Sequence, residues 1–381
     1  MSEWPMVKLG DLGEFINGFA FKPSDWSEDG TPIIRIQNLT NPQALFNRTT
    51  KRVKDVLYVE PGDLLVSWSA TLGVFRWQGK ELAVLNQHIF KVVSKPIIEN
   101  EFLEFSLKFA LQQVEKYLHG ATMRHVNRQE FLDLKIPLPP LREQKRIAEI
   151  LGGVSKAIQK TKVQLLLVDS LGENKYLSLS KDADTFKSLE DLSVKKITGK
   201  SIVAKPDNEH GVNQIIKVSA VSSGRFIASE SKPLPADYEP NNLHEIHQGD
   251  LLFARASGSA NLLGACCIVD KEIQHLYLPD KVWKLEVDED ILPKVYLLHA
   301  LRGREFRSVA ESHFSSSTGV KNIKTSVLME FKIPVLKQDQ LNDYVHFVKT
   351  LDNLRHLLHR KLSLLQELQK SLANRAFAGL L

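Results

Sequence analysis

Apolar positions follow a repeat of about 3.5 residues in two long segments of the chain. In the first segment, apolar or small residues fall three or four positions apart, at Ile147, Leu151, Val154, Ile158, Thr161, Leu165 and Val168. In the second segment, the series is Leu351, Leu354, Leu358, Leu362, Leu365, Leu368 and Leu372. This spacing is typical of the packing seam of a coiled coil. It predicts two long helices, over residues 141–180 and 336–381, each about 45 Å long or more.

The other two segments, 1–140 and 181–335, have short apolar runs separated by turns. Pro61-Gly62-Asp63 and Gln248-Gly249-Asp250 are turn sequences that lead directly into apolar runs. These segments are predicted to form two mixed α/β (α+β) domains in which strands are prominent. The expected organisation is therefore a first domain (1–140), a helix (141–180), a second domain (181–335) and a second helix (336–381).

The same motifs occur twice in the same order. Leu9-Gly10-Asp11-Leu12 is repeated as Leu189-Glu190-Asp191-Leu192, and Gly62-Asp63-Leu64-Leu65 returns as Gly249-Asp250-Leu251-Leu252. A string that ends at Ile136-Pro137 in one half ends at Ile333-Pro334 in the other. The chain is therefore a duplicated unit. Related domains tend to pack about a pseudo-two-fold axis, which would make the two helices antiparallel.

Composition adds limits on the class of protein. The chain has 381 residues, of which 43% are hydrophobic and 25% are charged, as expected for a globular protein of two domains. It has no 18-residue apolar run and no secretion signal, so we expect a cytoplasmic protein that makes no contact with a membrane. A formal net charge of +5 permits a nucleic-acid partner without requiring one.

Motifs for enzymatic chemistry or metal binding are not found. Thr198-Gly199-Lys200-Ser201 resembles the end of a phosphate-binding loop, but Val194 stands where that loop needs its first glycine. His244 and His247 are three residues apart rather than the four of a zinc-protease helix, and His356 and His359 are expected at the surface. Cys266 and Cys267 are expected on opposite faces of one strand as buried, reduced thiols. No catalytic or metal-ligating residue is predicted.

Three classes of polar loop recur in both halves: after an early strand, after the strand that follows the Gly-Asp turn, and before the last strand. They carry residue types that bind DNA phosphates or base edges. Each residue taken singly is more simply a turn former or a solvated charge, but the recurrence of the set favours function. The candidate DNA contacts are Arg35, Gln37, Asn38, Ser67, Trp68, Ser69, Thr71, Arg124, His125 and Arg128 in the first half, and Lys217, Ser219, Arg255, Ser257, Ser259, Asn261, Ser316, Ser317, Thr318, Lys321 and Lys324 in the second.

Two such readers, held apart by stiff helices, would contact two DNA segments about 34 Å apart and leave the bases between them unread. The loop residues differ between the halves, so the expected target is a split, asymmetric double-stranded site.

One string at the first domain boundary is more specific. Ile136-Pro137-Leu138-Pro139-Pro140 is followed by Glu143-Gln144 and then by the first long helix. With the repeated motifs, it makes the chain similar over essentially its whole length to the DNA-specificity (S) subunits of type I restriction-modification systems. The second copy departs from this pattern, because Val335 and Leu336 follow Ile333-Pro334 without a double proline.

The resemblance implies a noncatalytic subunit with one target-recognition domain in each half. The helices would act as spacer and as docking surface for two methyltransferase subunits, and through them for a restriction and translocation subunit. The complex would direct adenine methylation or cleavage to a gapped site. The methyl donor, ATP and magnesium would be bound by the partners, and no cofactor by this chain.

Two other interpretations remain open on the sequence alone. The chain could be a detached part of a restriction-methylation enzyme with activity of its own, although it lacks methyl-donor and nuclease motifs. It could also be a protein-interaction scaffold whose β-rich domains contact no DNA.

Overall fold

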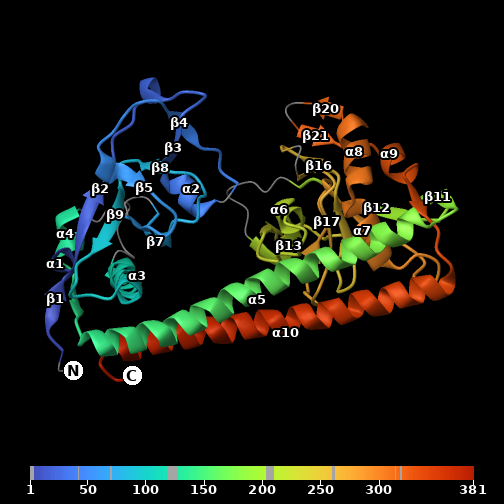
Figure 1. The fold of residues 1–381 in the computed structure, drawn as a ribbon. Helices are drawn as coiled ribbons and strands as arrows, with labels where there is room; N and C mark the ends of the chain where they lie inside the picture. The colour runs from blue at the N-terminus through green and yellow to red at the C-terminus, as the bar shows by residue number, and fades with distance from the viewer. Residues whose placement is uncertain are drawn as a thin grey trace. The chain divides into compact units, whose positions relative to one another are not determined.

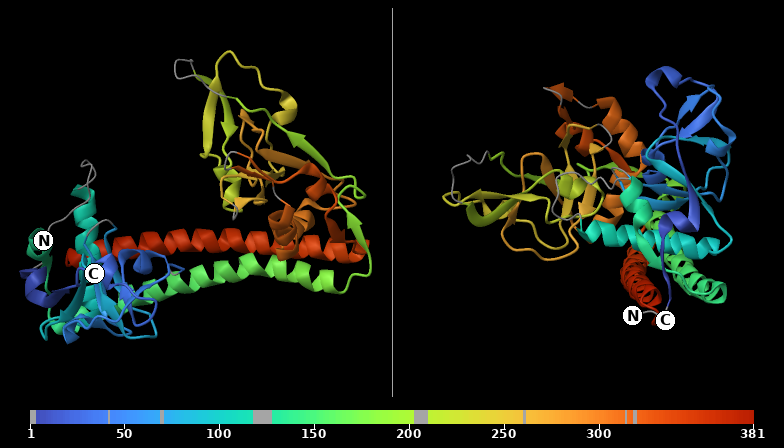
Figure 2. Two further views of the ribbon diagram at one scale, coloured as in Figure 1. Left: turned by 90° about the horizontal axis from the view of Figure 1, so that it is seen from above. Right: turned by 90° about the vertical axis from the view of Figure 1, so that its left-hand side faces the viewer.

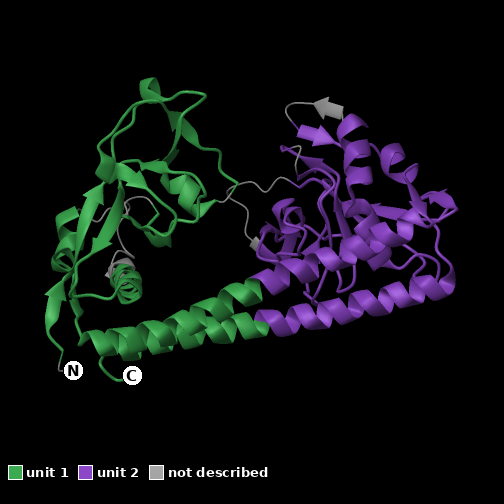
Figure 3. Cartoon of the chain, in the orientation of Figure 1, with its two compact units in different colours: residues 1–162, 360–381 green, residues 163–359 purple. Residues whose placement is uncertain are grey.

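A computed structural model describes residues 4–41, 43–68, 71–117, 128–202, 210–259, 262–313, 315–317 and 320–381. The chain divides into two compact units (Figure 3). Unit 1 consists of residues 1–162 together with 360–381, and unit 2 consists of residues 163–359. The N-terminal and C-terminal segments of the chain therefore belong to the same unit.

Two helices are much longer than the others and contribute to both units. Helix α5 spans Leu141–Lys181 and α10 spans Gln338–Phe377 (Figure 1). The first part of α5 and the last part of α10 belong to unit 1, and the remaining parts belong to unit 2. The predicted domain boundaries at 140, 180 and 335 lie near the ends of these helices. The boundary between the two compact units instead falls within both helices. The reason is that each half of the helical pair packs against the globular part of the unit to which it belongs.

The two helices contact each other in each unit, taken separately. In unit 1, Gln369 on α10 donates a hydrogen bond from Nε2 to the Oγ of Ser155 on α5, at 2.7 Å. In unit 2, Arg355 donates from Nε to Asp169 at 2.7 Å, and Tyr344 donates to the carbonyl oxygen of Gly172 at 3.4 Å. Within unit 2, the residue number thus rises along α5 as it falls along the paired part of α10.

Unit 1 contains ten strands and four short helices besides the long pair, among the described residues. The strands are β1 (Met6–Lys8), β2 (Gly13–Asn17), β3 (Thr31–Ile34), β4 (Asn47–Thr49), β5 (Tyr58–Val59), β6 (Leu64–Ser67), β7 (Gly73–Arg76), β8 (Ala83–Leu85), β9 (Ile89–Ser94) and β10 (Lys135–Pro137). The helices are α1 (Leu9–Leu12), α2 (Ile36–Thr40), α3 (Asn100–Tyr117) and α4 (Arg128–Asp133), with short 3-10 turns at Pro23–Asp25 and Asp55–Leu57.

Unit 2 has a closely similar series of elements. Its strands are β11 (Phe186–Ser188), β12 (Lys195–Thr198), β13 (His210–Ile216), β14 (Ser231–Pro235), β15 (Leu251–Ala254), β16 (Ala256–Ser257), β17 (Cys266–Ile268), β18 (Leu276–Tyr277), β19 (Val282–Glu286), β20 (Ser315–Ser317), β21 (Val320–Asn322) and β22 (Lys332–Pro334). Its helices are α6 (Ser219–Ser222), α7 (Lys294–Arg302), α8 (Arg304–His313) and α9 (Thr325–Met329), with a 3-10 turn at Asn242–His244.

The central sheets of the two units have the same strand order, and unit 2 has a further three-stranded sheet, β16-β21-β20. The central antiparallel sheet is β2-β9-β6-β7 in unit 1 and β12-β19-β15-β17 in unit 2. A second sheet pairs β3 with β8 in parallel in unit 1, and β13 with β18 in parallel in unit 2. A two-stranded ribbon joins the start of each mixed α/β segment to its last strand, as β1-β10 and as β11-β22. The repeated motifs of the sequence therefore correspond to repeated topology.

The strand after each Gly-Asp turn is buried on both faces. Leu64 and Val66 pack with α3 in one apolar cluster, whereas Leu65 belongs to the cluster on the other face of the sheet. In unit 2, the neighbouring thiols Cys266 and Cys267 of β17 point to opposite clusters in the same way. Both thiols are buried and free, as the sequence indicated.

The seam of α10 differs from the prediction. Leu354 and Leu368 were expected in the seam, but their side chains are 43% and 45% exposed. Arg355 and Gln369 take the seam positions instead, and both reach polar groups on α5. The predicted seam used leucines wherever they were present, so its positions Leu354 and Leu368 come one residue before Arg355 and Gln369, which contact α5.

The other predicted seam positions lie at or near the interface of the pair. Figures 1 and 2 show the helices side by side within each unit. The buried members are Ile147, Leu151, Ile158, Thr161, Leu165, Val168, Leu351 and Leu358, and the half-buried members are Val154, Leu362, Leu365 and Leu372.

Candidate nucleic-acid interface

A glycine with positive φ lies in the turn before the central strand of the candidate site in each unit. Gly62 has φ 95° and Gly249 has φ 88°, a backbone conformation that side chains with a Cβ disfavour. The turn directs β6 and β15 into the centre of their sheets. The candidate residues Trp68 and Arg255 follow directly after these strands, at matching positions.

Aromatic rings support the second candidate loop of unit 1. The ring of Trp68 is stacked on Phe90 with centroids 5.6 Å apart, and it meets the ring of His88 at 5.1 Å. Arg128, an exposed residue at the start of α4, holds its guanidinium 5.9 Å from the centre of the Phe90 ring. The structure therefore brings the second and third loop classes together around Phe90. Thr71 is exposed at the edge of this region.

Two candidates of unit 1 have structural roles. Ser67 is fully buried, and its hydroxyl donates to the carbonyl oxygen of Thr71 at 2.7 Å. Asn38 is buried, and its amide donates to the carbonyl oxygens of Ala44 and Leu45, both at 3.2 Å, and accepts from the Arg35 amide at 3.0 Å. Asn38 was chosen as an adenine reader, but its amide group is engaged within the loop.

The rest of the first loop of unit 1 is more accessible. The guanidinium of Arg35 lies 5.6 Å from the ring centre of Trp26 and donates to Asn47 at 3.1 Å. Gln37 is exposed on α2. A planar cation held over an aromatic ring keeps part of its donor edge free for an anion.

Unit 2 repeats this arrangement with different residues. The guanidinium of Arg255 lies 5.7 Å from the ring centre of Trp283, which occupies the place of Phe90, and Lys196 approaches the same ring at 5.1 Å. Arg255 also donates from Nε to the carbonyl oxygen of Asp280 at 2.9 Å. A stacked aromatic in unit 1 is thus replaced by a stacked cation in unit 2.

The small residues of the second loop in unit 2 join the third loop through a short sheet. Strand β16 pairs with β21, which places Ser257 opposite Lys321, and β21 pairs with β20, which places Ser316 opposite the same lysine. Ser257 is buried and accepts from the amide of Ser259 at 3.2 Å, whereas Ser259 and Lys324 are exposed.

The first loop of unit 2 carries an acidic residue beside its candidates. Glu230 accepts from the hydroxyl of Ser219 at 2.6 Å and lies 3.8 Å from the ammonium of Lys217. Both candidates are exposed, so the glutamate lowers the local positive charge without hiding them.

Several candidates cannot be placed. Ser69, Arg124, His125, Asn261 and Thr318 lie outside the described residues, and Ser316 and Ser317 are described only as part of strand β20.

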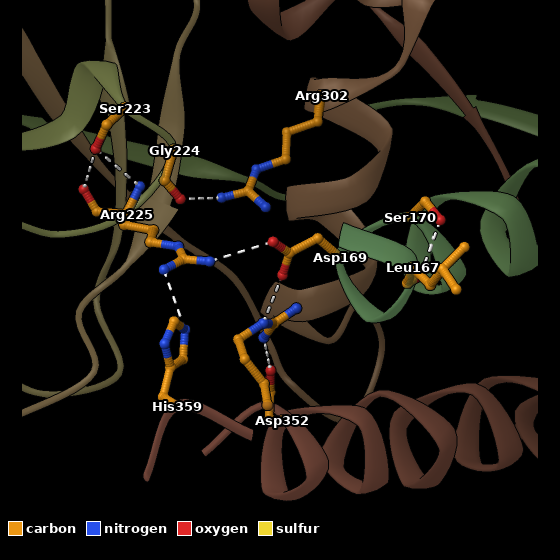
Figure 4. A network of polar contacts seen from close by, with 10 residues as sticks. Leu167, Asp169, Ser170, Ser223, Gly224, Arg225, Arg302, Asp352 and His359 are labelled. Carbon is orange, nitrogen blue, oxygen red and sulfur yellow. Dashed lines mark hydrogen bonds and ion pairs between the residues drawn. The ribbon is translucent and has the colours of Figure 1, made fainter. Parts of the chain in front are cut away.

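An ion-pair network attaches the loop after α6 in unit 2 to the helical pair of the same unit (Figure 4). Asp169 on α5 accepts from Arg225 at 3.2 Å and from Arg355 on α10 at 2.7 Å, and Arg355 also pairs with Asp352. Arg225 lies in the loop after α6 and also contacts His359 on α10 at 3.2 Å. Burial, with a smaller contribution from the charge of Arg225, lowers the pKa of His359. The network lines a cavity of about 980 Å³ that lies entirely within unit 2.

Metal-binding clusters and membrane helices are not found in the described part of the chain. No group of three or more histidine, cysteine or acidic side chains there is arranged to hold a metal ion. His247, for example, pairs with Glu272 at 3.1 Å. None of the helices, over the same residues, has the length and apolar character needed to span a bilayer.

Comparison with known proteins identifies the family. Residues 1–167 match the type I restriction modification DNA specificity domain. The chain is 24% identical to the EcoKI specificity subunit of Escherichia coli, covering 99% of this chain and 89% of the relative. It is 23% identical to the MjaVIII specificity subunit of Methanocaldococcus jannaschii, covering 99% and 92%.

Solved structures agree in fold. The S subunit of a type I system from M. genitalium aligns over 99% of this chain and 96% of its own, with a TM-score of 0.53 and 14% identity. A chain from a structure that describes assembly and conformational transition of the type I system aligns over 99% and 98%, with a TM-score of 0.55 and 13% identity. The match to the family model and the similarity to curated specificity subunits over 99% of this chain show that the chain belongs to the family of type I restriction-modification DNA-specificity subunits.

Proposed function

We propose that the chain is the DNA-reading subunit of a type I restriction-modification complex and that each unit reads one part of a bipartite, asymmetric site. The observation that carries this proposal is the recurrence of one surface position on the same scaffold. Trp68 and Arg255 both follow the central strand, and each packs on an aromatic ring of the neighbouring strand. Similar scaffolds with different side chains at the same position suit the reading of two different sequences.

The long helices would set the gap between the two parts of the site. A continuous α-helix is stiff over tens of ångströms and rises 1.5 Å per residue, so a pair of helices can act as a ruler. Polar residues within an apolar seam fix the register of a coiled coil. Arg355 and Gln369 have this role in unit 2 and unit 1 respectively.

Two methyltransferase subunits would dock on the helices and bring a restriction and translocation subunit with them. Apolar side chains on the outside of α5 support a protein partner: Leu166 is 70% exposed and Leu167 is 58% exposed. Leu357 on α10 is 65% exposed. A docked protein partner would cover these leucines and remove their apolar surface from water.

In this role the chain selects the site and its partners perform the reaction. Adenine methylation and DNA cleavage, with the methyl donor, ATP and magnesium they require, would belong to the partner subunits. The complex would act in the cytoplasm, where the DNA is.

The proposal is tested by selecting bound duplexes from a random library with the purified full-length chain, alone and together with its methyltransferase partner. We expect enrichment of one motif made of two unlike parts with an unread gap, and no methyl transfer by the chain alone. Binding without any enriched motif would favour a scaffold, and methyl transfer by the chain alone would favour an enzyme.

A further inference from the structure

The turn between β8 and β9 is not among the candidate DNA contacts predicted from the sequence. It consists of Gln87 and His88, and both side chains are exposed. His88 has φ 69°, in the left-handed region that residues other than glycine rarely adopt. Strain of this kind is retained in proteins where the surrounding structure enforces it, often at a functional site.

Segments from all three candidate loop classes of unit 1 meet at or beside this turn. The backbone amide of Asn86, at the start of the turn, donates to the carbonyl oxygen of Ile34, the residue before Arg35 in the first loop. Trp68 of the second loop donates its amide to the carbonyl oxygen of His88 at 3.3 Å and packs its ring on the imidazole. Phe90 of β9 is two residues after His88, and the guanidinium of Arg128 from the third loop lies over its ring. The turn is therefore central to the candidate surface.

Two buried polar atoms beside the turn have no hydrogen-bond partner among the described residues. They are Nε1 of the Trp68 indole and Oδ1 of the Asn86 amide. A buried donor or acceptor without a partner costs stability and is rare in native structures. The segment around the turn is therefore held in place at a cost in hydrogen bonding as well as in backbone strain.

Unit 2 holds the corresponding turn in the same way. Asp280 and Lys281 lie between β18 and β19, and Arg255 donates its amide to the carbonyl oxygen of Lys281 at 3.1 Å. Its guanidinium donates to the carbonyl oxygen of Asp280 at 2.9 Å. The side chain of Lys281 is exposed. Both turns are thus fixed by the residue after the central strand, and their side chains differ.

We propose that these two turns, Gln87–His88 and Asp280–Lys281, enter the DNA groove and read base edges, one in each part of the site. This inference rests on the proposed function. Gln pairs with the edge of adenine, Lys with guanine, and Asp accepts from the amino group of cytosine. Unit 1 therefore reads an A·T pair at this position and unit 2 reads a G·C pair.

The test repeats the selection with the full-length chain carrying Gln87→Ala, His88→Gly or the double change Asp280→Ala with Lys281→Ala. Glycine is used at His88 because it adopts φ 69° without strain. Each turn variant should lose discrimination at one base pair by roughly 10-fold, in one part of the motif only. The other part serves as an internal control for folding. Gln112→Ala, which removes an exposed glutamine from α3, should leave the motif unchanged.

The possible results distinguish a failure of the proposed function from a failure of base reading by the two turns. If the wild-type chain yields no bipartite motif, the proposed function fails. If the wild-type motif is obtained and the turn variants reproduce it, the turns do not read bases and the inference fails. Equal weakening at all sequences, with a shallower salt dependence, would assign the turns to phosphates and would also overturn base reading.

Discussion

The ammonium group of Lys91 lies 2.8 Å from the carboxylate of Asp63, and the equivalent pair, Lys284 and Asp250, lies at 3.5 Å. Each lysine also donates to a backbone carbonyl oxygen, that of Tyr58 in unit 1 and that of Glu245 in unit 2. The aspartate of the Gly-Asp motif therefore anchors a lysine of the neighbouring strand. Its recurrence reflects the needs of the fold and not contact with DNA.

Replacing Asp250 with Ala should destabilise unit 2 by about 3 kcal/mol, because it leaves a buried lysine without its counter-charge. Lys284 is only 6% exposed. The free energy of unfolding from urea titration measures the change. Glu230→Ala, which removes an exposed carboxylate near Lys217, is the matched control and should cost less than about 1 kcal/mol. Equal costs for the two variants would contradict a structural role for the pair.

Gln144 provides a second structural test in the Pro-Pro-x-x-Glu-Gln string. Its buried amide donates to the carbonyl oxygens of Ile97 and Pro139 and accepts from the amide of Glu99 at 2.7 Å. Gln144→Ala leaves these groups unpaired, so unit 1 should lose about 2 to 3 kcal/mol. Gln340→Ala, at the exposed counterpart that accepts one bond, should have little effect. Thermal unfolding of both variants gives the comparison, and a larger loss for the Gln340 variant would be inconsistent with this view.

His299 should make unit 2 sensitive to acid. Its ring is buried, and its Nδ1 is hydrogen-bonded to the hydroxyl of Tyr344. Burial, followed by the nearby charges of Arg302 and Arg355, lowers the pKa of His299 from 6.5 to about 4. Between these two pKa values, His299 is protonated in the unfolded chain and neutral in the folded unit. Stability is fully present above pH 6.5 and falls as the pH drops towards 4, by about 3 kcal/mol at most.

Hydrogen exchange of unit 2 peptides between pH 7 and pH 4, corrected for intrinsic rates, measures this loss. His299→Gln keeps a polar side chain but cannot titrate, so its stability should vary less over the same range. A variant with the same pH dependence as the wild type would show that another group is responsible.

Arg255→Ala tests the cation that lies on Trp283 and holds the Asp280–Lys281 turn. It should weaken DNA binding and relax only the part of the motif that unit 2 reads. The binding constant and the selected motif, determined at several salt concentrations, distinguish base from phosphate contact. Uniform weakening with a shallower salt slope would make Arg255 a phosphate contact.

An insertion of four residues in α5 between Ser155 and Thr161 tests the ruler role. It lengthens the helix by about 6 Å, which corresponds to roughly two base pairs. The gap of the selected motif should change while both half-sites stay the same. The same insertion between Ala236 and Asp237, two exposed residues of unit 2, should leave the gap unaltered. An unchanged gap in the α5 variant would refute the ruler role.

Local pattern predicted the long helices and the recurrence, because a 3.5-residue repeat and turn motifs are properties of short segments. It did not predict which residues occupy the seam at 355 and 369. That choice depends on polar groups of the partner helix, Asp169 and Ser155, which are distant in sequence.

The candidate site was predictable only in part. Trp68 and Arg255 could be chosen as candidates because they follow a recognisable turn and strand, and the structure places them at matching positions. Asn38 was misassigned because its backbone partners become visible only once the loop is folded. The Gln87–His88 turn gave no sequence signal, since its importance comes from three segments that meet there in space.

The central claim is that this chain selects a split DNA site for modification by others. Mapping of methylated adenine across the genome, in cells with the gene for this chain and in cells from which it is deleted, tests that claim most directly. We predict that one asymmetric motif with an unread gap is methylated when the gene is present and loses its methylation when the gene is deleted. Methylation maps that are identical in the two strains would contradict the account.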